Sequence, residues 1–463
     1  MTEATGSLTA ARGLEAGALP VGSPAPILAG PVRPPYGAAV GRSGEGRSAR
    51  MSTRRSDKYE GRYAARTKVM RSSAMRDLMS LAARPEVISL AGGFPATDTF
   101  PQEVFDRINA DISQTRRALS LQYGPTEGFD FLKDDIAEVM AAEGVRVDPA
   151  HVLVTTGGQQ AIDLVSKTFI DPGDVVLAEG PSYAGALTTF SSYQATVLHA
   201  PMDASGLVVD ELEALIDRLA AEGRRAKFLY IVPTFSNPGG TTLTLERRLR
   251  LVELAAERDL LILEDNPYGI LRYEGAPLPT LLSLDRDANV IYLGSFSKIL
   301  SPGIRTGWIV APPAILQKCV FGKQATDLCS SPLNQLFVHE FVASGAWLDY
   351  VERLKVLYRS RRDTLLAALA EEFPEGSHWT VPEGGFFVWA TLPAPVHTGD
   401  LLVKAIEENV AFVRGDAFFM DGQGTSSMRL NFSGNPEERI QEGVRRLGAV
   451  IRDQIELYRA LGL

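Results

Sequence analysis

The stretch Ser295-Phe-Ser-Lys-Ile-Leu-Ser-Pro-Gly-Ile-Arg-Thr-Gly-Trp308 places a lysine, Lys298, among small hydroxyl residues and an arginine, Arg305, shortly after it. The apolar run Asn289–Gly294 before it predicts a buried strand, so Lys298 lies just past the carboxyl end of that strand, where open α/β sheets bind ligands. A lysine amine forms a Schiff base with a carbonyl compound once burial or neighbouring positive charge lowers its pKa. Hydroxyls and a guanidinium supply hydrogen-bond donors for a phosphate. Taken alone, the stretch also fits an exposed loop lysine beside a turn.

Other polar residues also follow apolar strands. Asp265 ends the run Leu260–Asp265 and is followed by Tyr268, whereas Asn237 comes after the apolar strand Lys227–Val232, in a segment that leads into a Pro/Gly turn. With Lys298 they form the ordered set Asn, Asp-x-x-Tyr and Ser-x-Ser-Lys. Each motif is weak singly, and their combination is specific.

This set resembles the class I/II aminotransferases of pyridoxal-phosphate fold type I, from about Met70 to the C-terminus. The chain is most similar to the 2-aminoadipate and kynurenine/aromatic aminotransferase subgroup. Four further motifs carry that likeness: Ile88–Pro95, Leu121–Gly128, Thr155–Gln160 and Met428–Phe432. The resemblance implies a pyridoxal 5'-phosphate enzyme that moves the amino group of an L-amino acid, with a 2-aminoadipate, aromatic or aliphatic side chain, to a 2-oxo acid such as 2-oxoglutarate by a ping-pong mechanism.

The segment Gly157–Gln160 lies between a predicted strand and a predicted helix, so the N-H groups at the helix start would meet a phosphate with the positive end of the helix dipole. A plain strand-to-helix turn is the alternative. Related enzymes often carry a hydroxyl at the position of Gly158. The resemblance implies that the cofactor contacts Gly157, Gly158, Gln159, Ser295, Ser297 and Arg305 at its phosphate.

The resemblance also implies roles around the cofactor ring. Lys298 anchors the cofactor and then carries the proton of the reaction. Asp265 keeps the ring nitrogen protonated, so that the ring stabilises the carbanion left by proton loss. Asn237 and Tyr268 hydrogen-bond the phenolic oxygen, and Tyr183 stacks on the ring.

Substrate contacts follow from the same resemblance. Arg429 binds the α-carboxylate with bidentate geometry, assisted by Asn237, and Gly93 lies at the substrate. Tyr123 reaches the phosphate from the partner subunit, which implies a homodimer with shared active sites. Arg76 either pairs with the distal carboxylate of 2-oxoglutarate or 2-aminoadipate or is a solvated helix residue. Phe94 and Tyr123 would also tolerate apolar or aromatic side chains.

Composition fits a large acidic enzyme. The chain has 463 residues, 45% of them hydrophobic, and a net charge of -9, which argues against nucleic acid or an anionic membrane as a partner. Two cysteines and five scattered histidines indicate neither a disulfide framework nor a metal site. No apolar run has the length of a membrane span and no secretory signal is recognised, so we expect the cytoplasm.

Apolar strands alternate with helical stretches, which predicts an α/β fold with a mainly parallel sheet between helices. The resemblance makes this a seven-stranded sheet with one antiparallel strand, plus a smaller α/β domain. We expect a disordered Gly/Ala/Pro-rich extension over residues 1–57, in which Met51 is an alternative start. Residues 58–98, with a helix near 72–81, would join the small domain. Residues 99–344 would form the large domain and residues 345–463 the small one.

Two other functions use this scaffold. A pyridoxal-phosphate lyase or decarboxylase would differ in the bond that is cleaved, and formation of a keto acid would separate it from an aminotransferase. A MocR-type regulator uses the scaffold as a ligand sensor, but it requires a basic DNA-binding domain that the Gly/Pro-rich residues 1–50 are too short to supply.

Overall fold

The computed structural model describes residues 58–70 and 84–462 of the chain. The expected helix near 72–81, which includes Arg76, and the extension 1–57 lie outside these described residues. The chain divides into two units, Met1–Gly61 and Arg62–Leu463. In the first, the described residues Lys58–Gly61 are exposed. Within the described ranges, no helix is both long enough and apolar enough to cross a membrane.

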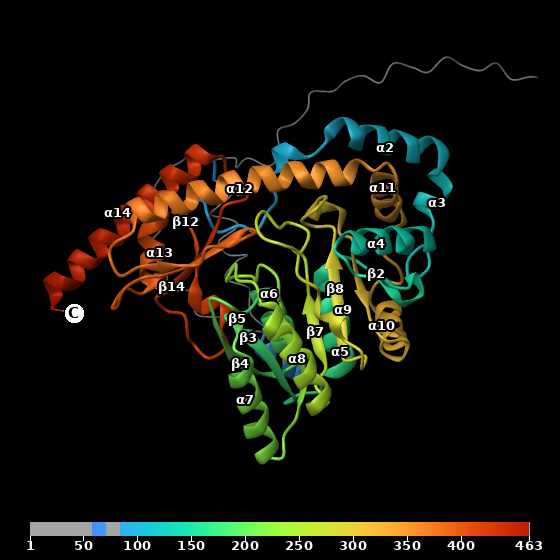
Figure 1. Ribbon diagram of the computed structural model, residues 1–463, viewed down its shortest axis with the longest axis horizontal. Coiled ribbons are helices and arrows are strands. Elements are labelled where there is room, and N and C mark those ends of the chain that lie inside the picture. The colour runs from blue at the N-terminus through green and yellow to red at the C-terminus, as the bar shows by residue number, and fades with distance from the viewer. Residues whose placement is uncertain (1–57, 71–83, 463) are drawn as a thin grey trace, which may run out of the picture. The chain divides into compact units, whose positions relative to one another are not determined.

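An eight-stranded sheet forms the centre of Arg62–Leu463 (Figure 1). Its strands, in spatial order, are β2 (Val152–Thr155), β9 (Gly307–Val310), β8 (Val290–Ser295), β7 (Ile262–Asp265), β6 (Ala226–Ile231), β3 (Val175–Gly180), β4 (Thr196–Asp203) and β5 (Gly206–Leu207). Strands β8, β7, β6, β3 and β4 run parallel, whereas β9 is antiparallel to both neighbours. The mainly parallel sheet and its antiparallel strand were therefore predicted correctly. The additional strand, β5, has two residues, too few for a periodic signal.

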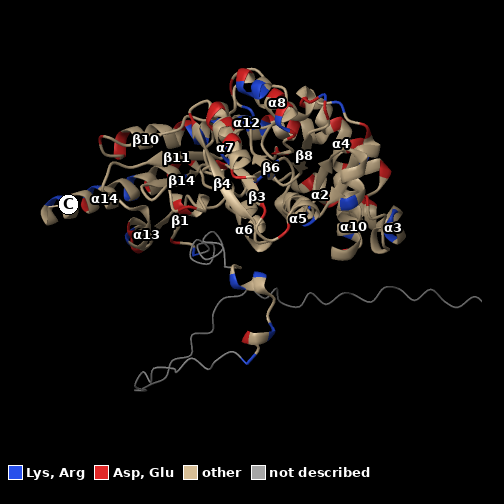
Figure 2. Cartoon of the chain, turned by 90° about the horizontal axis from the view of Figure 1, so that it is seen from below, with Lys and Arg blue, Asp and Glu red and all other residues tan. Residues whose placement is uncertain are grey.

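Both faces of this sheet are covered by helices because its strands are apolar on both sides. Phe228 and Tyr230 of β6 pack with α5 (Gly158–Phe169), α6 (Ala184–Ser192) and α10 (Pro313–Thr326). Their neighbours Leu229 and Ile231 pack with α7 (Val209–Ala221), α8 (Leu245–Arg258) and α9 (Leu281–Leu284). Successive side chains of a strand point to opposite faces, so these are two separate hydrophobic layers. Figure 2 shows the charged residues gathered on the helices, while β3, β6 and β8 are almost free of charge.

A second, four-stranded antiparallel sheet lies toward the C-terminus. Its order is β10 (His378–Trp379), β11 (Phe387–Thr391), β14 (Ser427–Asn431) and β13 (Val413–Arg414). The helices of this region are α12 (Ala346–Glu372), α13 (Thr398–Glu407) and α14 (Glu437–Leu461), and α12 and α14 lie side by side (Figure 1). Strand β1 (Ile88–Ser89) pairs in parallel with β12 (Val410–Ala411), so the start of the aminotransferase-like sequence joins its C-terminal part.

Four helices pack together beside the β2 edge of the large sheet. Helix α11 (Pro332–Ala343) contacts α2 (Gln102–Thr115), α3 (Arg117–Leu121) and α4 (Asp130–Ala142). The hydroxyl of Ser331 caps α11 by accepting a hydrogen bond from the Asn334 amide. Short 3-10 turns complete the described chain: η1 (Glu60–Arg62), η2 (Ala65–Lys68), η3 (Thr97–Thr99), η4 (Pro149–His151), η5 (Pro302–Ile304) and η6 (Gly415–Phe418).

Arg248, on α8, holds the segment between β6 and Asn237 in place through hydrogen bonds. Its side chain is fully buried. It donates hydrogen bonds to the Leu243, Pro233 and Pro279 carbonyl oxygens and to Thr234 Oγ1, over 2.7–2.9 Å. Burial lowers the pKa of Arg248 to about 10, so the guanidinium stays charged at neutral pH. A buried charge is tolerated only when such hydrogen-bond partners satisfy it. Here the partners belong to the turns at the carboxyl edge of the large sheet.

We expect Arg248→Met to lower the free energy of unfolding by about 2–4 kcal/mol, because it removes four hydrogen bonds from the buried turns, including those to the Leu243 and Pro279 carbonyl oxygens. Chemical denaturation followed by circular dichroism measures this change. Arg445→Met is the matched control, since Arg445 is exposed and pairs with Glu442 on the surface of α14. Similar denaturation midpoints for the two variants would contradict the role given to Arg248.

Candidate active site

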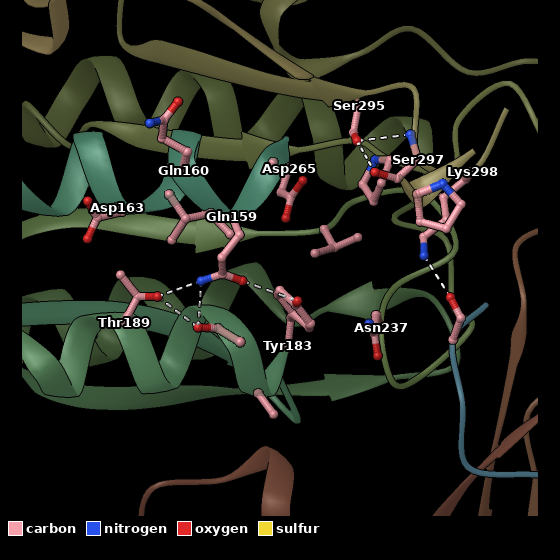
Figure 3. Close-up of a pocket in the computed structure, with 18 of the residues that line it drawn as sticks. Gln159, Gln160, Asp163, Tyr183, Thr189, Asn237, Asp265, Ser295, Ser297 and Lys298 are labelled. Atoms are coloured by element: carbon pink, nitrogen blue, oxygen red, sulfur yellow. Dashed lines mark hydrogen bonds between the residues drawn. The ribbon is translucent and has the colours of Figure 1, made fainter. Parts of the chain in front are cut away.

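A pocket of about 980 Å³ opens at the carboxyl edge of the large sheet (Figure 3). It collects side chains that follow separate strands: Asp265 ends β7, Ser295 ends β8, and Ser297 and Lys298 come directly after β8. The structure brings most of the predicted site residues to this pocket, namely Gly93, Gly158, Gln159, Tyr183, Asn237, Asp265, Tyr268, Ser295, Ser297, Lys298, Arg305 and Arg429. Gly157 lies immediately before the first residue of α5, at the same edge.

Lys298 is half-buried, and its Nζ donates a hydrogen bond of 2.7 Å to the Gly93 carbonyl oxygen. Burial lowers the pKa of Lys298 to about 8, and the positive charges of Arg429 and Arg305 act in the same direction, whereas Asp265 opposes them. A lysine with this pKa is neutral in an appreciable fraction of molecules near pH 7, which a nucleophile or base requires.

Asp265 is buried and accepts a hydrogen bond of 2.7 Å from the hydroxyl of Tyr230, which is also fully buried. Burial raises the pKa of Asp265 to about 6, while the Tyr230 hydrogen bond and Lys298 act to lower it. The carboxyl group is therefore mostly ionised at neutral pH. A buried anion at the bottom of a pocket is suited to holding a cationic ligand group.

The turn before α5 forms one end of the pocket. Gly157 has a φ of +79°, and a Cβ there would lie 2.5 Å from Nη2 of Arg305, so only glycine allows this close approach. Nη2 of Arg305 donates to the Thr156 carbonyl oxygen at 3.2 Å. On the facing loop, the amide of Ser297 donates to Ser295 Oγ at 3.1 Å. Helix-start amides, hydroxyls and a guanidinium thus surround a space suited to an anion.

Gln159 and Tyr183 line the adjoining wall (Figure 3). The Tyr183 hydroxyl donates to Gln159 Oε1 at 3.3 Å, and Gln159 Nε2 donates to Thr189 Oγ1 at 2.7 Å. Burial raises the pKa of the Tyr183 hydroxyl, with a further contribution from Asp265. The neutral ring presents a flat apolar surface to the pocket.

Arg429 enters the pocket from β14 of the smaller sheet. It is 1% exposed; its Nη1 donates to Asn237 Oδ1 at 2.8 Å and its Nη2 to the Ala91 carbonyl oxygen at 2.6 Å. Its guanidinium carbon lies 4.1 Å from the ring centre of Phe387 and 5.1 Å from that of Phe418. Burial lowers the pKa of Arg429 to about 10, so it remains a cation. These contacts hold the planar group in one orientation.

Tyr268 lies beside Asn237 in the same pocket. Its hydroxyl is buried, and burial is the main cause that raises its pKa, while Arg429 and a hydrogen bond from Asn237 act to lower it. Tyr268 is therefore a neutral hydrogen-bonding group at neutral pH.

One predicted residue of the described chain, Tyr123, lies away from this pocket. Tyr123 follows α3 and is 76% exposed, so it does not line the pocket of its own subunit. Arg76 lies outside the described residues. Phe94 lines the pocket and is partly exposed, as expected for a residue near the substrate.

The sequence analysis missed three residues that organise the site. Tyr230 lies in a strand that was predicted, but only the pairing of β6 with β7 brings its hydroxyl to Asp265. Phe387 and Phe418 pack on Arg429 from positions that carry no recognisable motif. A tyrosine inside an otherwise apolar strand was the one available signal, because a buried hydroxyl requires a partner.

Known proteins match this chain over most of its length. Residues 85–447 match the family described as aminotransferase class I and II. Aromatic-amino-acid aminotransferase 1 of Thermococcus litoralis is 42% identical over 399 residues, which are 86% of this chain and 96% of the relative.

Two solved structures resemble the fold. Kynurenine aminotransferase of Pyrococcus horikoshii in complex with PMP has a TM-score of 0.82 and 40% identity, covering 86% of this chain and 98% of that one. Alpha-aminoadipate aminotransferase of Thermus thermophilus, complexed with N-(5'-phosphopyridoxyl)-L-leucine, has a TM-score of 0.80 and 40% identity, covering 86% and 99%.

These matches confirm the predicted fold type I architecture and the pyridoxal-phosphate cofactor, and they favour amino transfer over the lyase and regulator alternatives. The chain belongs to the class I and II aminotransferases and is a pyridoxal-phosphate enzyme that transfers the amino groups of amino acids.

Proposed function

We propose that this enzyme transfers the amino group of L-amino acids with aromatic, aliphatic or 2-aminoadipate side chains to a 2-oxo acid, with 2-oxoglutarate as the first acceptor to test. The observation that carries the proposal is the buried Arg429 guanidinium, held by Asn237 and two aromatic rings in the pocket that contains Lys298. A planar, fixed donor of this kind suits a carboxylate that every amino acid carries.

The pocket fits the cofactor at both ends. The glycine turn with Arg305, Ser295 and Ser297 fits the phosphate, and the buried Asp265 carboxylate fits a protonated ring nitrogen. When bound, pyridoxal phosphate supplies an electron sink for the charge that remains after the α-proton of the amino acid has been removed. Among the other proposed contacts, Tyr183 would cover the ring and Gly157, Gly158 and Gln159 would contact the phosphate.

Lys298 would carry the proton of the reaction. Its pKa of about 8 allows the amine to accept a proton from the substrate α-carbon and to release it at the aldehyde carbon of the cofactor. Tyr230 would hold the Asp265 carboxylate in one orientation, and Asn237 and Tyr268 would hydrogen-bond the phenolic oxygen. Water is restricted around these groups because most of them are buried.

The substrate's side chain would face Phe94, Phe387 and Gly93, which offer an apolar surface. Among the described residues that line the pocket, Lys298, Arg305 and Arg429 are the cations, and each already has a proposed role. A second carboxylate on the substrate would therefore depend on another cation. Arg76 remains the candidate from the sequence. The leucine adduct in the Thermus thermophilus relative supports the inclusion of aliphatic substrates.

We also infer a homodimer in which Tyr123 reaches the phosphate site of the partner subunit. Tyr123 and Leu121 are 76% and 75% exposed, unusually high values for large apolar side chains. Helix α3 contacts α11, and Gly124 lies close to Pro332 at the start of α11, where Leu333 is also exposed. Such a surface is typical of one that is covered by another chain.

The division into residues 58–98 and 345–463 as a small domain and 99–344 as a large domain is likewise a proposal. The pairing of β1 with β12 supports the assignment of the N-terminal segment, and the separate four-stranded sheet supports the C-terminal one. The cytoplasmic location stays a prediction.

The decisive experiment is an amino-donor panel with 2-oxoglutarate, in which both the keto acid from the donor and glutamate are measured. We expect the two products in equal amounts, with aromatic, aliphatic and 2-aminoadipate donors active and Lys298→Ala inactive. Carbon dioxide or ammonia without a matching keto acid and glutamate would instead assign a decarboxylase or lyase.

Lys298 should also show its lowered pKa directly. We expect the rate of covalent attachment of pyridoxal phosphate to the cofactor-free full chain to rise about tenfold per pH unit below pH 8 and to level off above it, because only the neutral amine reacts. Stopped-flow absorbance measures the rate, and borohydride reduction should leave the cofactor on the Lys298 peptide. A rate that keeps rising toward pH 10.5, as for a lysine with the ordinary pKa, would show that burial does not activate Lys298.

Arg429 and Arg76 should affect different substrates. Arg429→Leu should reduce kcat/KM for every amino donor, since all donors carry the α-carboxylate. The reduction should correspond to a loss of about 2–5 kcal/mol in transition-state stabilisation. Arg76→Ala should weaken the binding of 2-aminoadipate and 2-oxoglutarate by about 1–3 kcal/mol and leave the binding of leucine and phenylalanine nearly unchanged. Arg414→Leu is the control, because Arg414 pairs with Asp416 away from the pocket. Equal losses for acidic and apolar donors in Arg76→Ala would remove the proposed role of Arg76.

Shared active sites can be tested by mixing two inactive variants. Lys298→Ala chains keep Tyr123, and Tyr123→Ala chains keep Lys298, so a mixed dimer has one complete site only if Tyr123 acts across the interface. We expect activity to reappear when the two proteins are unfolded and refolded together, and not when each is refolded alone. No recovery, with mixed dimers verified by affinity tags, would place Tyr123 outside the partner's site.

A further inference from the structure

A second lysine, Lys323 on α10, is fully buried and is not part of the pocket wall. Its Nζ donates hydrogen bonds to Asp327 Oδ1 and Oδ2 at 2.9 and 3.0 Å, to Gln160 Oε1 at 3.0 Å and to Ser330 Oγ at 3.0 Å. A buried ammonium group is tolerated only with such partners, so this cluster is a fixed part of the structure.

The partners of Lys323 extend to the pocket. Asp327 Oδ2 accepts hydrogen bonds from Thr156 Oγ1 at 2.8 Å and from Gln160 Nε2 at 2.7 Å. Gln160 Oε1 accepts another from the Thr156 amide at 2.7 Å. Thr156, Gln160 and Asp327 all line the pocket. Lys323 therefore does not line the pocket itself. It contacts Asp327 and Gln160, which line the pocket and bind Thr156.

Thr156 is the residue on which this cluster converges, and it directly precedes the glycine turn. Its amide and hydroxyl are held by Gln160 and Asp327, and its carbonyl oxygen accepts a hydrogen bond from Arg305 at 3.2 Å. All of its polar groups are thus satisfied. The conformation of the turn at Gly157 and the placement of Arg305, the two main parts of the proposed phosphate site, both depend on Thr156.

Charge gives the cluster a second effect. The Asp327 side chain is 26% exposed and borders the pocket, whereas the Lys323 side chain is 0% exposed. Burial acts to raise the pKa of Asp327, but hydrogen bonds from Lys323, Gln160 and Thr156 lower it overall, so it is an anion. An unpaired carboxylate at this position would repel a phosphate dianion, and the ammonium group of Lys323 neutralises it.

We propose that Lys323 is a positioning residue for the cofactor phosphate: through Asp327 and Gln160 it holds the Thr156–Gly157 turn in place, and it neutralises the carboxylate that borders the phosphate site. This inference rests on the proposed function, because that function places the phosphate at the turn.

The test measures phosphate recognition separately from activity. Full-length protein is freed of cofactor and titrated with pyridoxal phosphate and with pyridoxal, and the ratio of the two affinities reports the phosphate contribution. In parallel, the phosphorus NMR signal of the holoenzyme reports the surroundings of the phosphate. The variants are Lys323→Met, Asp327→Asn and the double variant. Lys318→Met is the matched control, since Lys318 is exposed on the same helix. Thermal unfolding verifies that each variant is folded.

We expect Lys323→Met to lower the affinity ratio by about tenfold or more and to move the phosphorus signal toward that of the free cofactor. Asp327→Asn should keep most of the ratio, because the one oxygen that asparagine retains can accept from Thr156, Gln160 and Lys323, and no unpaired negative charge is created beside the phosphate. The double variant should recover much of the loss seen in Lys323→Met, since no unpaired charge is left beside the phosphate.

An unchanged ratio in Lys323→Met would overturn the proposal, as would an equal loss in Lys323→Met and Asp327→Asn without recovery in the double variant. If Lys323→Met does not fold, Asp327→Asn serves as the test. A roughly tenfold loss of the affinity ratio in Asp327→Asn would contradict the proposal that Lys323 acts by neutralising the Asp327 carboxylate. A wild-type protein without any preference for pyridoxal phosphate over pyridoxal would instead reject the proposed phosphate site itself. A failure of the cluster and a failure of the site are thereby distinguished.

Discussion

Burial of charged side chains at the carboxyl edge of the large sheet is the constraint on which the rest of the structure depends. Burial lowers the pKa of Lys298 to about 8 and raises that of Asp265 to about 6, so the two values approach each other near neutral pH. A shift of this kind is typical of a group in a functional site. It requires that water be excluded without leaving the charges unsatisfied, and this requirement explains the hydrogen bonds around the pocket.

Three buried cations meet that requirement in different ways. Arg429 is held by an amide, a carbonyl group and two aromatic rings, which fix its orientation at the pocket. Arg248 is satisfied by carbonyl groups and organises the turns before Asn237. Lys323 is neutralised by Asp327 and organises the turn before α5. One cation thus lines the pocket, and the other two stabilise the backbone turns around it.

The site also depends on contact between the two sheets. Asn237 follows β6 of the large sheet, Arg429 lies on β14 of the small one, and Ala91 comes from the segment after β1. The hydrogen bonds of Arg429 to Asn237 and Ala91 join these three parts directly. A change in the placement of the small sheet would therefore move Arg429 before it moved Lys298 or Asp265. The position of Arg429 in the pocket is in this sense more sensitive to the arrangement of the sheets than the positions of Lys298 and Asp265 are.

The sequence by itself determined the longer strands of the large sheet and the polar residues at their ends, because apolar runs and turn residues are local signals. Lys298, Asp265 and Asn237 could be placed at one edge in advance, since the carboxyl ends of parallel strands share an edge. The tertiary structure alone decided that Tyr230 meets Asp265, that Phe387 and Phe418 enclose Arg429, and that Lys323 supports Thr156 through Asp327. The physical reason is that most of these contacts join residues far apart in the chain, where strand order and register determine which side chains meet, and no local pattern of residues encodes them.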